Sequence, residues 1–498
     1  MSANAEEPLS AIDWLSDTVA APVVARPNPV PRLDEAAVSS NASVEDVTVS
    51  KLGTTTSDSV GLLPVSVTGL PRGFWGQTPS TELARIIRAA PTESLPALQE
   101  LLQMILLAEL DAPIDTDGTN ALFLARIDKL LDIGSLDQAQ ALLERAGAGT
   151  PDLFRRWFDV ALLTGTEHKA CETLRLNADI SPTFQARIFC LARNGDWSAA
   201  AVTLETAKVL GYISKEENAL MARFLDPELF EGKPAPPRPK PVTPLVFRMF
   251  EAIGEALPTA ALPRAFAVAD LRNNIGWKPQ LEAAERLAAH GAIEENKLLG
   301  LYTERKPAAS GGVWERVKAV QKFDQAYTAK NAEMVAKTLP IAWAEMKRAA
   351  LAPIFAEIYG SALADMELEK GAARLAFQVG LLSKDYEKVA NRFKPVTITE
   401  QFLVALAKGD LAKIQAPNAK ARSIKQAFLA RETPAEYARL IKDKKLAEAV
   451  LKAISNFPEN GSGSLDNARK SLILLRSVGL EDVARRASLQ LMLLDDQG

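Results

Sequence analysis

Apolar and polar positions alternate with the period of an α-helix along most of the chain. From about residue 60 onward, apolar residues recur three and four positions apart, as in residues 95–110 and 120–134. This spacing places them on one face of a helix. No segment shows a convincing two-residue alternation, which would indicate a half-buried strand. The pattern therefore predicts an all-α fold.

Two stretches of the sequence repeat one another without gaps. Residues 134–146 and 195–207 carry glycine, alanine, leucine, glutamate and alanine at matching offsets. Glycine permits a tight turn between helices, and the apolar residues after it lie on one face of the following helix. One helical hairpin cannot bury such a face alone, so neighbouring hairpins must stack. The residues expected to make this packing are Gly134, Ala139, Leu143, Gly195, Trp197, Ala200, Leu204 and Ala207.

The turn and second helix of these units resemble the tetratricopeptide repeat (TPR), whose pattern is matched by Gly195, Trp197, Ala200, Leu204 and Ala207. The two units are 61 residues apart, whereas that repeat has a period of about 34 residues. The first-helix signature of the repeat is not evident. The resemblance therefore implies an irregular, TPR-like α-solenoid of stacked helical hairpins and no particular family.

Composition shifts divide the chain. Residues 1–58 are rich in small polar residues and acids without sustained periodicity, which is typical of a disordered acidic tail. Residues 231–244 (EGKPAPPRPKPVTP) are rich in proline, which favours an extended linker. We therefore expect an N-terminal helical array at 60–230 and a C-terminal helical array at 245–498.

An apolar but irregular segment leads into the first array. Residues 60–76 (VGLLPVSVTGLPRGFWG) are interrupted by proline and glycine, so they cannot form one continuous helix. The favoured interpretation is a strap packed on the first helices. The alternative is an exposed aromatic surface for a peptide, formed by Phe74 and Trp75.

The acidic tail contains one short amphipathic motif at residues 9–19. Ser10 can cap a helix there, and Asp13 follows three residues later. An isolated helix this short is marginal in water, so we expect it to form on binding. Its site is either a groove in a partner protein or the solenoid of the same chain, and both alternatives stay open. The apolar anchors of the motif are Leu9, Ile12, Trp14, Leu15 and Val19.

Charge changes this picture little. The chain has a net charge of −4, but residues 391–450 hold twelve Lys/Arg and six Asp/Glu. We interpret this surplus as solvated helix faces, since nucleic-acid binding favours a denser patch with interleaved aromatic residues. No run approaches the roughly 18 apolar residues of a membrane helix. The sequence therefore predicts no membrane insertion and makes nucleic acid an unfavoured partner.

Few residues offer metal or redox chemistry. The chain has two cysteines, Cys171 and Cys190, and two histidines, His168 and His290. Two cysteines imply no disulfide framework, and no signal peptide is visible, so we expect a cytoplasmic protein. His168, Cys171 and Cys190 make three soft ligands, whereas a structural zinc site normally uses four. We expect no metal and no cofactor.

No catalytic motif is recognisable. The chain lacks a phosphate-binding loop, a dinucleotide fingerprint and a nucleophile elbow. We therefore expect a non-enzymatic scaffold or adaptor for protein–protein interaction, including an assembly factor for a larger bacterial machine of the cell envelope or of motility. The alternatives are a helical superhelix domain of an enzyme system and a nucleic-acid-binding helical protein. The sequence leaves the partner and the oligomeric state open.

Overall fold

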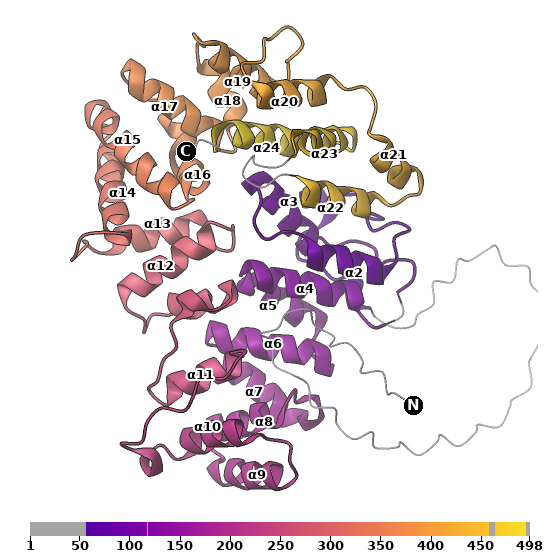
Figure 1. Ribbon diagram of the computed structural model, residues 1–498, viewed down its shortest axis with the longest axis vertical. Helices are drawn as coiled ribbons and strands as arrows, with labels where there is room; N and C mark the ends of the chain where they lie inside the picture. The colour runs from indigo at the N-terminus through magenta and orange to yellow at the C-terminus, as the bar shows by residue number, and fades with distance from the viewer. Residues whose placement is uncertain (1–55, 117, 458–463, 495–498) are drawn as a thin grey trace, which may run out of the picture.

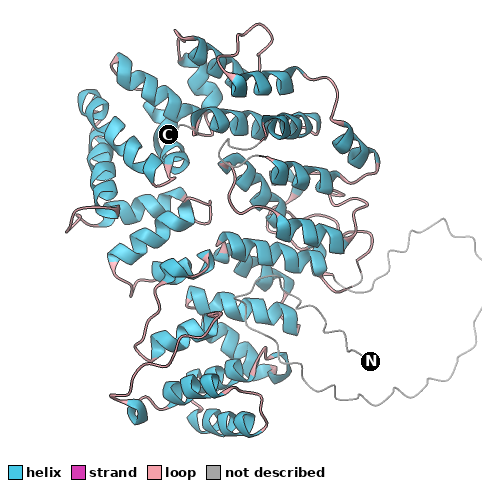
Figure 2. Ribbon diagram, in the orientation of Figure 1, coloured by secondary structure: helices cyan, strands magenta, loops and turns pink. Residues whose placement is uncertain are grey.

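The computed structural model describes residues 56–457, apart from residue 117, and residues 464–494. These residues form helices joined by turns and loops, and no strand is present among them (Figure 2). An isolated β-bridge joins Leu63 and Ala108. The predicted all-α fold is confirmed.

The first part of the chain forms a succession of short helices. They are η1 (Ser57–Ser59), α1 (Val65–Thr68), α2 (Ser80–Ala89), α3 (Pro96–Leu107), α4 (Ala121–Ile133), α5 (Leu136–Ala146), α6 (Pro151–Thr164), α7 (Glu167–Leu176), η2 (Ala178–Ile180), α8 (Phe184–Arg193), α9 (Trp197–Val209), α10 (Lys215–Leu225) and η3 (Glu228–Phe230).

The second part begins after the proline-rich segment. Its helices are α11 (Pro244–Ala252), η4 (Thr259–Ala261), η5 (Arg264–Leu271), α12 (Trp277–Ala288), α13 (Glu295–Glu304), α14 (Val313–Thr328), α15 (Ala332–Arg348), α16 (Ala352–Leu363), α17 (Lys370–Leu381), α18 (Tyr386–Arg392), α19 (Ile398–Lys408), α20 (Ala419–Leu429), α21 (Ala435–Lys442), α22 (Leu446–Asn456), α23 (Leu465–Ser477) and α24 (Glu481–Leu493).

Consecutive helices pack on one another as stacked hairpins, which confirms the irregular α-solenoid. The pairs α5–α6, α7–α8, α8–α9 and α14–α15 all form extensive contacts. Local sequence explains where several helices begin: Ser214 with Glu217 and Thr397 with Glu400 form capping boxes at the starts of α10 and α19. Buried leucine, alanine and aromatic side chains fill the space between hairpins.

The two ends of the described chain meet. α24 packs on α3 and α22 packs on α2, so the last helices cover the first ones (Figure 1). Beyond the proline-rich segment, α11 packs back on α6 and η5 packs on α4 and α6. One buried hydrophobic cluster includes residues from α2 to α12 and again from α17 to α24. A second cluster lies within α12–α17. The division into two arrays at 231–244 stays a prediction.

The lead-in segment acts as a strap between the two ends. Phe74 and Trp75 are buried, so they form no exposed aromatic surface. The Ala447 amide donates to the Phe74 carbonyl at 3.1 Å, and the Gln77 amide donates to the Lys444 carbonyl at 2.9 Å. A Cβ at Gly76 would lie 1.9 Å from that same Lys444 oxygen, so the close approach requires glycine.

Candidate interaction site at the end of the array

Several of the exposed apolar side chains in residues 56–230 gather on α9 and the turn after it. Val202, Val209 and Leu210 are 68%, 82% and 61% exposed. α9 lies at the lower end of the molecule in Figure 1, where it packs on α8 and α10. The helix at the end of a stack normally presents a polar outer face to water. On the outer side of α9, exposed apolar residues lie among the polar residues Ser198, Glu205 and Thr206. We call the exposed apolar residues the α9 face (Trp197, Ala201, Val202, Val209 and Leu210).

Charge contributes little to the α9 face. Glu205 lies among the apolar residues, and Lys208 donates to it at 3.1 Å. Both side chains are exposed, so this pair adds little stability. The two charges cancel, which leaves a surface suited to apolar contacts.

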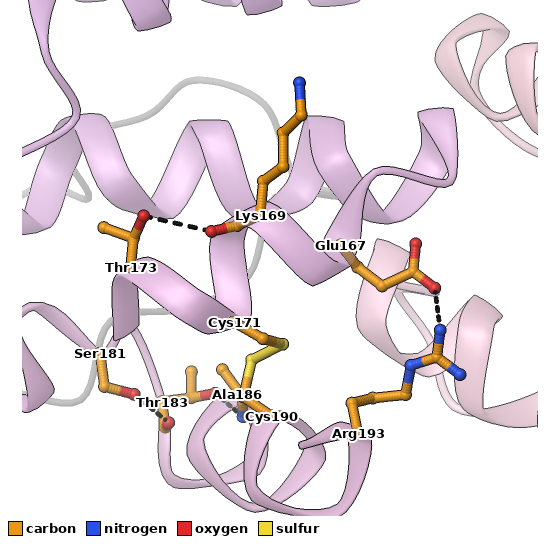
Figure 3. The surroundings of a disulfide bond; sticks show 9 residues. All are labelled: Glu167, Lys169, Cys171, Thr173, Ser181, Thr183, Ala186, Cys190 and Arg193. Carbon is orange, nitrogen blue, oxygen red and sulfur yellow. Dashed lines mark hydrogen bonds and ion pairs between the residues drawn. A yellow bond between two sulfur atoms is a disulfide. The ribbon is translucent and has the colours of Figure 1, made fainter. Parts of the chain in front are cut away.

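A disulfide fixes the helices that support α9. Cys171 of α7 and Cys190 of α8 are bonded to each other and buried (Figure 3). Thr183 caps the start of α8 by accepting from the Ala186 amide at 3.0 Å. The expectation of unbridged cysteines is therefore wrong: 19 residues separate the two cysteines in the sequence, and the hairpin turn brings them together.

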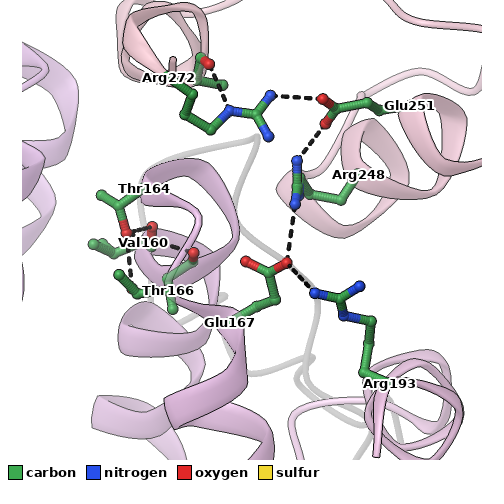
Figure 4. Close-up of polar contacts among 10 residues, drawn as sticks. Val160, Thr164, Thr166, Glu167, Arg193, Arg248, Glu251 and Arg272 are labelled. Atoms are coloured by element: carbon green, nitrogen blue, oxygen red, sulfur yellow. Dashed lines mark hydrogen bonds and ion pairs between the residues drawn. The ribbon is translucent and has the colours of Figure 1, made fainter. Parts of the chain in front are cut away.

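An alternating series of charges ties the same hairpin to α11. Glu167 of α7 accepts from Arg193 of α8 at 3.0 Å and from Arg248 of α11 at 2.9 Å (Figure 4). Arg248 also pairs with Glu251, which in turn accepts from Arg272 at 2.8 Å. Glu167 is buried, so two arginines compensate a carboxylate that would otherwise lose its hydration. α7 and α8 therefore provide a rigid base for α9.

We expect the double substitution Cys171→Ala/Cys190→Ala to lower the free energy of unfolding by about 3 kcal/mol, because the bond closes a loop of about 20 residues. Urea unfolding of the non-reduced proteins measures the change. Wild-type protein treated with a reductant should show the same loss. An unchanged unfolding midpoint in both samples would mean that the cysteines are not bonded in solution.

The residues of the predicted repeat packing lie mostly where the pattern placed them. Gly134 and Gly195 have positive φ angles, of 96° and 86°, at the turns before α5 and α9. The side chains of Ala139, Leu143, Ala200, Leu204 and Ala207 are buried. Trp197 differs: its side chain is 51% exposed and its ring lies 6.4 Å from that of Phe224. It stands at the edge of the α9 face, not between two hairpins.

The tail motif with Leu9, Ile12, Trp14, Leu15 and Val19 lies outside the described residues. Its role stays a prediction.

The sequence reasoning missed Val202 and Val209, although a signal was present. The apolar residues of 197–209 (WSAAAVTLETAKV) are spread around the helix and do not gather on one face. A helix of that kind is normally covered on all sides. In this fold α8 and α10 cover only part of it. This spread of apolar residues was thus a sequence signal that some of them are exposed on α9.

We searched the part of the chain that the structure describes for side-chain groups that could bind a metal ion and for helices that could cross a membrane. Among residues 56–457 and 464–494, no three His, Cys, Asp or Glu side chains are grouped so that they could hold a metal ion. Within the same residues, every helix is too short or too polar to cross a membrane.

One polar junction lies where three distant helices meet. Arg486 of α24 donates to both carboxylate oxygens of Glu100 of α3, at 2.7 and 2.9 Å. It also lies 3.5 Å from Glu357 of α16. The adjoining cavity has a volume of about 80 Å³. Ligand pockets usually have volumes of about 300 Å³ or more, so this junction suits a role in closing the fold.

Burial raises the pKa of Glu357 above its ordinary value, against the opposing effects of Lys384 and Arg486. The folded protein therefore holds this proton at pH values where the unfolded chain has released it. Ionised Glu357 then costs stability at neutral pH, and this cost disappears as the pH falls through the raised pKa towards 4.5.

We expect Glu357→Gln to be more stable than the wild type at pH 7, with the difference shrinking as the pH falls towards 4.5. Thermal unfolding from pH 4 to pH 8 checks this. Glu216→Gln, at an exposed position of α10, is the matched control and should follow the wild-type profile. A variant that is less stable than the wild type at pH 7 would contradict the expected direction.

Comparisons of the chain with models of protein families, with curated proteins and with solved structures found no match. No family is thereby assigned. The function has to be inferred from the residues of this chain.

Proposed function

We propose that this chain is a non-enzymatic scaffold or adaptor, and that the α9 face binds another protein. The observation that carries the proposal is the exposure of Val202 and Val209 on the outermost helix of a stack. Covering such a surface removes apolar area from water, at roughly 25 cal/mol per Å². Contiguous exposed apolar patches on soluble proteins often mark interaction sites.

The chemistry of the face indicates the kind of partner. Because Glu205 and Lys208 pair with each other, a strongly charged surface would gain little here. An apolar and weakly charged surface of another protein would match it best. The rigid base formed by α7, α8 and α11 limits the entropy lost on binding. An assembly factor for a larger bacterial machine, in the cell envelope or in motility, is one form of this function.

The test compares proteins recovered with tagged chains from cells that naturally make this protein. The variant Val202→Glu/Val209→Glu places two charges on the α9 face. The control Ile341→Glu alters another exposed apolar residue, 60% exposed, on α15. We expect one protein to be retained by the wild type and the control and lost by the double variant.

Two outcomes would overturn the proposal. If both variants retain the same proteins as the wild type, the α9 face binds none of them. If the wild type sediments as a dimer and the double variant as a monomer, the face joins two copies of this chain. Circular dichroism spectra that coincide for all chains show that each variant remains folded.

The sequence and the disulfide point to different cellular compartments for this protein. The sequence favours the cytoplasm, whereas a Cys171–Cys190 disulfide is typical of an oxidising compartment. Alkylation of thiols in living cells, followed by mass spectrometry, distinguishes the two. Alkylated cysteines would support a cytoplasmic location. A bridged peptide would support an oxidising compartment.

A further inference from the structure

The connection between α10 and α11 is longer than its two ends require. Residues 226–243 join the two helices, and the helices contact each other. Helices that pack together are usually joined by about 2–8 residues. Even a return along all 11 residues of α10, roughly 16 Å, would take about five extended residues. Most of this connection is therefore not needed to link the helices.

Residues 234–239 (PAPPRP) form an exposed, extended part of this connection. They belong to no helix or strand, and proline fixes the φ angle of four of them near about −65°, as in polyproline II. Their exposure follows a period of three: Pro236 and Pro239 are half-buried, and the other four residues are exposed. Because polyproline II has three residues per turn, one edge lies against the protein and two edges face water. Pro234 and Pro237 share one of the water-facing edges, which we call the proline ridge.

Contacts at both ends hold the segment in place. Arg223 of α10 donates to the carbonyls of Pro234 and Lys233, at 2.7 and 3.1 Å. At the other end, Thr243 caps α11 by accepting from the Val246 amide at 3.3 Å. Among the described residues, no backbone amide donates to the carbonyls of residues 235–239, so these acceptors are open to a partner. A segment that is already extended loses less conformational entropy on binding than a flexible one.

Positive charge follows the proline ridge in the sequence. Arg238 and Lys240 are exposed, and neither pairs with an acidic side chain among the described residues. All three acids of the connection precede residue 233. From residue 233 to Arg238, polyproline II spans roughly 15 Å, which exceeds the Debye length of about 8 Å. The two charges are therefore available to an acidic partner.

We propose that the proline ridge binds a groove of another protein that is lined by aromatic side chains and acidic at one end. Aromatic-lined grooves recognise pairs of prolines three residues apart, because polyproline II presents both rings on one edge. Pro234 and Pro237 then pack on the aromatic rings, and Arg238 and Lys240 lie near the acidic groups. The segment is separate from the α9 face, and neither proposal depends on the other.

The first experiment titrates the immobilised full chain with a panel of purified SH3 and WW domains. The grooves of these domains are lined by aromatic side chains and bind Pro-x-x-Pro segments. The panel includes grooves with acidic groups at either end. We expect saturable binding by domains with an acidic groove, measured by biolayer interferometry, and weaker binding at high salt.

Matched proline variants assign this binding to the ridge. Pro234→Ala/Pro237→Ala should lower the affinity several-fold. Pro236→Ala/Pro239→Ala is the control, because it removes the same number of prolines from the edge that lies against the protein. The control should keep the wild-type affinity.

Charge variants test the acidic end of the groove. Arg238→Glu/Lys240→Glu should lower the affinity several-fold at low salt. Lys297→Glu/Lys330→Glu reverses two exposed charges in α13 and after α14, so it should bind like the wild type.

The second experiment identifies natural partners. A photo-reactive phenylalanine analogue replaces the exposed Ala235, next to the ridge, in cells that naturally make this protein. After irradiation, mass spectrometry identifies the residues joined to it. We expect cross-links to another protein, at a surface that contains aromatic and acidic residues, and their loss in Pro234→Ala/Pro237→Ala.

Several outcomes would overturn this proposal without affecting the α9 face. If no domain of the panel binds saturably, the ridge is not a ligand for such grooves. An equal loss of affinity in Pro234→Ala/Pro237→Ala and its proline control would mean that the ridge edge does not determine binding. Cross-links only within this chain, or only between two copies of it, would assign the segment to its own fold or to self-association. Loss of domain binding in Val202→Glu/Val209→Glu would place the contact on α9.

Discussion

The substitution Arg156→Met is expected to lower the free energy of unfolding by about 3–5 kcal/mol. Arg156 of α6 donates to both oxygens of Asp128 of α4, at 2.6 and 3.1 Å. Both side chains are almost completely buried. Methionine fills much of the same volume but leaves the Asp128 carboxylate without its main partner. The remaining cation, Arg88, lies 3.5 Å from it and does not replace two short hydrogen bonds.

Chemical unfolding monitored by circular dichroism measures this effect. The control Arg175→Met removes an exposed arginine that pairs with Glu172, and it should change stability by about 1 kcal/mol or less. The double variant Asp128→Leu/Arg156→Met should be more stable than Arg156→Met alone, because the Asp128 carboxylate is then removed together with its main partner. If the double variant is less stable than Arg156→Met, the unpartnered Asp128 carboxylate does not explain the loss of stability in Arg156→Met.

The substitution Arg126→Met is expected to lower the free energy of unfolding by about 3 kcal/mol or more, since each buried acceptor left without a donor costs about 1–3 kcal/mol. Arg126 is fully buried and donates to the carbonyls of Leu106 and Val60, both at 2.8 Å, and of Ala108 at 3.0 Å. It thereby joins α4 to the end of α3 and to the lead-in strap.

Burial lowers the pKa of Arg126 to about 10, while the nearby Asp58 opposes this shift. The guanidinium therefore remains charged at neutral pH, and its hydrogen bonds keep their full strength there. Burial also raises the pKa of Asp58, although the Phe123 amide and Arg126 act in the other direction. Asp58 and Arg126 therefore stabilise each other's charged form in a buried site.

Hydrogen exchange provides a local measurement for Arg126→Met. Amides of the strap and of the bridge between Leu63 and Ala108 should exchange faster in the variant, whereas those of α14 and α15 should change little. Arg145→Met is the matched control, because this exposed arginine pairs with Glu109 near the same strap. Equal protection of the strap in Arg126→Met and the wild type would contradict the anchoring role.

The helices, their turns and the buried face of several of them followed from the sequence alone. The spacing of apolar residues in 120–134 and 195–207 corresponds to α4 and α9, and the positive φ angles of Gly134 and Gly195 mark the predicted turns. These features depend on interactions over a few residues, which is the range that periodicity and turn chemistry describe. The absence of strands among the described residues follows from the same pattern.

The candidate site was only partly accessible to this reasoning. The pattern identified Ala200, Leu204 and Ala207 as packing residues, and they are buried. It could not assign an exposed face to α9, because the apolar residues of that helix are not confined to one side. Exposure of Trp197 and Val202 depends on where the stack of hairpins ends, and that is a property of the assembled fold.

Contacts between distant segments were decided by the tertiary structure alone. Arg486 and Glu100 lie 386 residues apart and form a bidentate pair, and the strap at Phe74 and Gln77 joins α22. The Cys171–Cys190 disulfide also depends on how α7 and α8 are placed. The contacts of α24 with α3 and of α22 with α2 depend on the orientations of all the hairpins between them. Local sequence rules can specify each helix, but they do not specify how successive hairpins are oriented relative to one another.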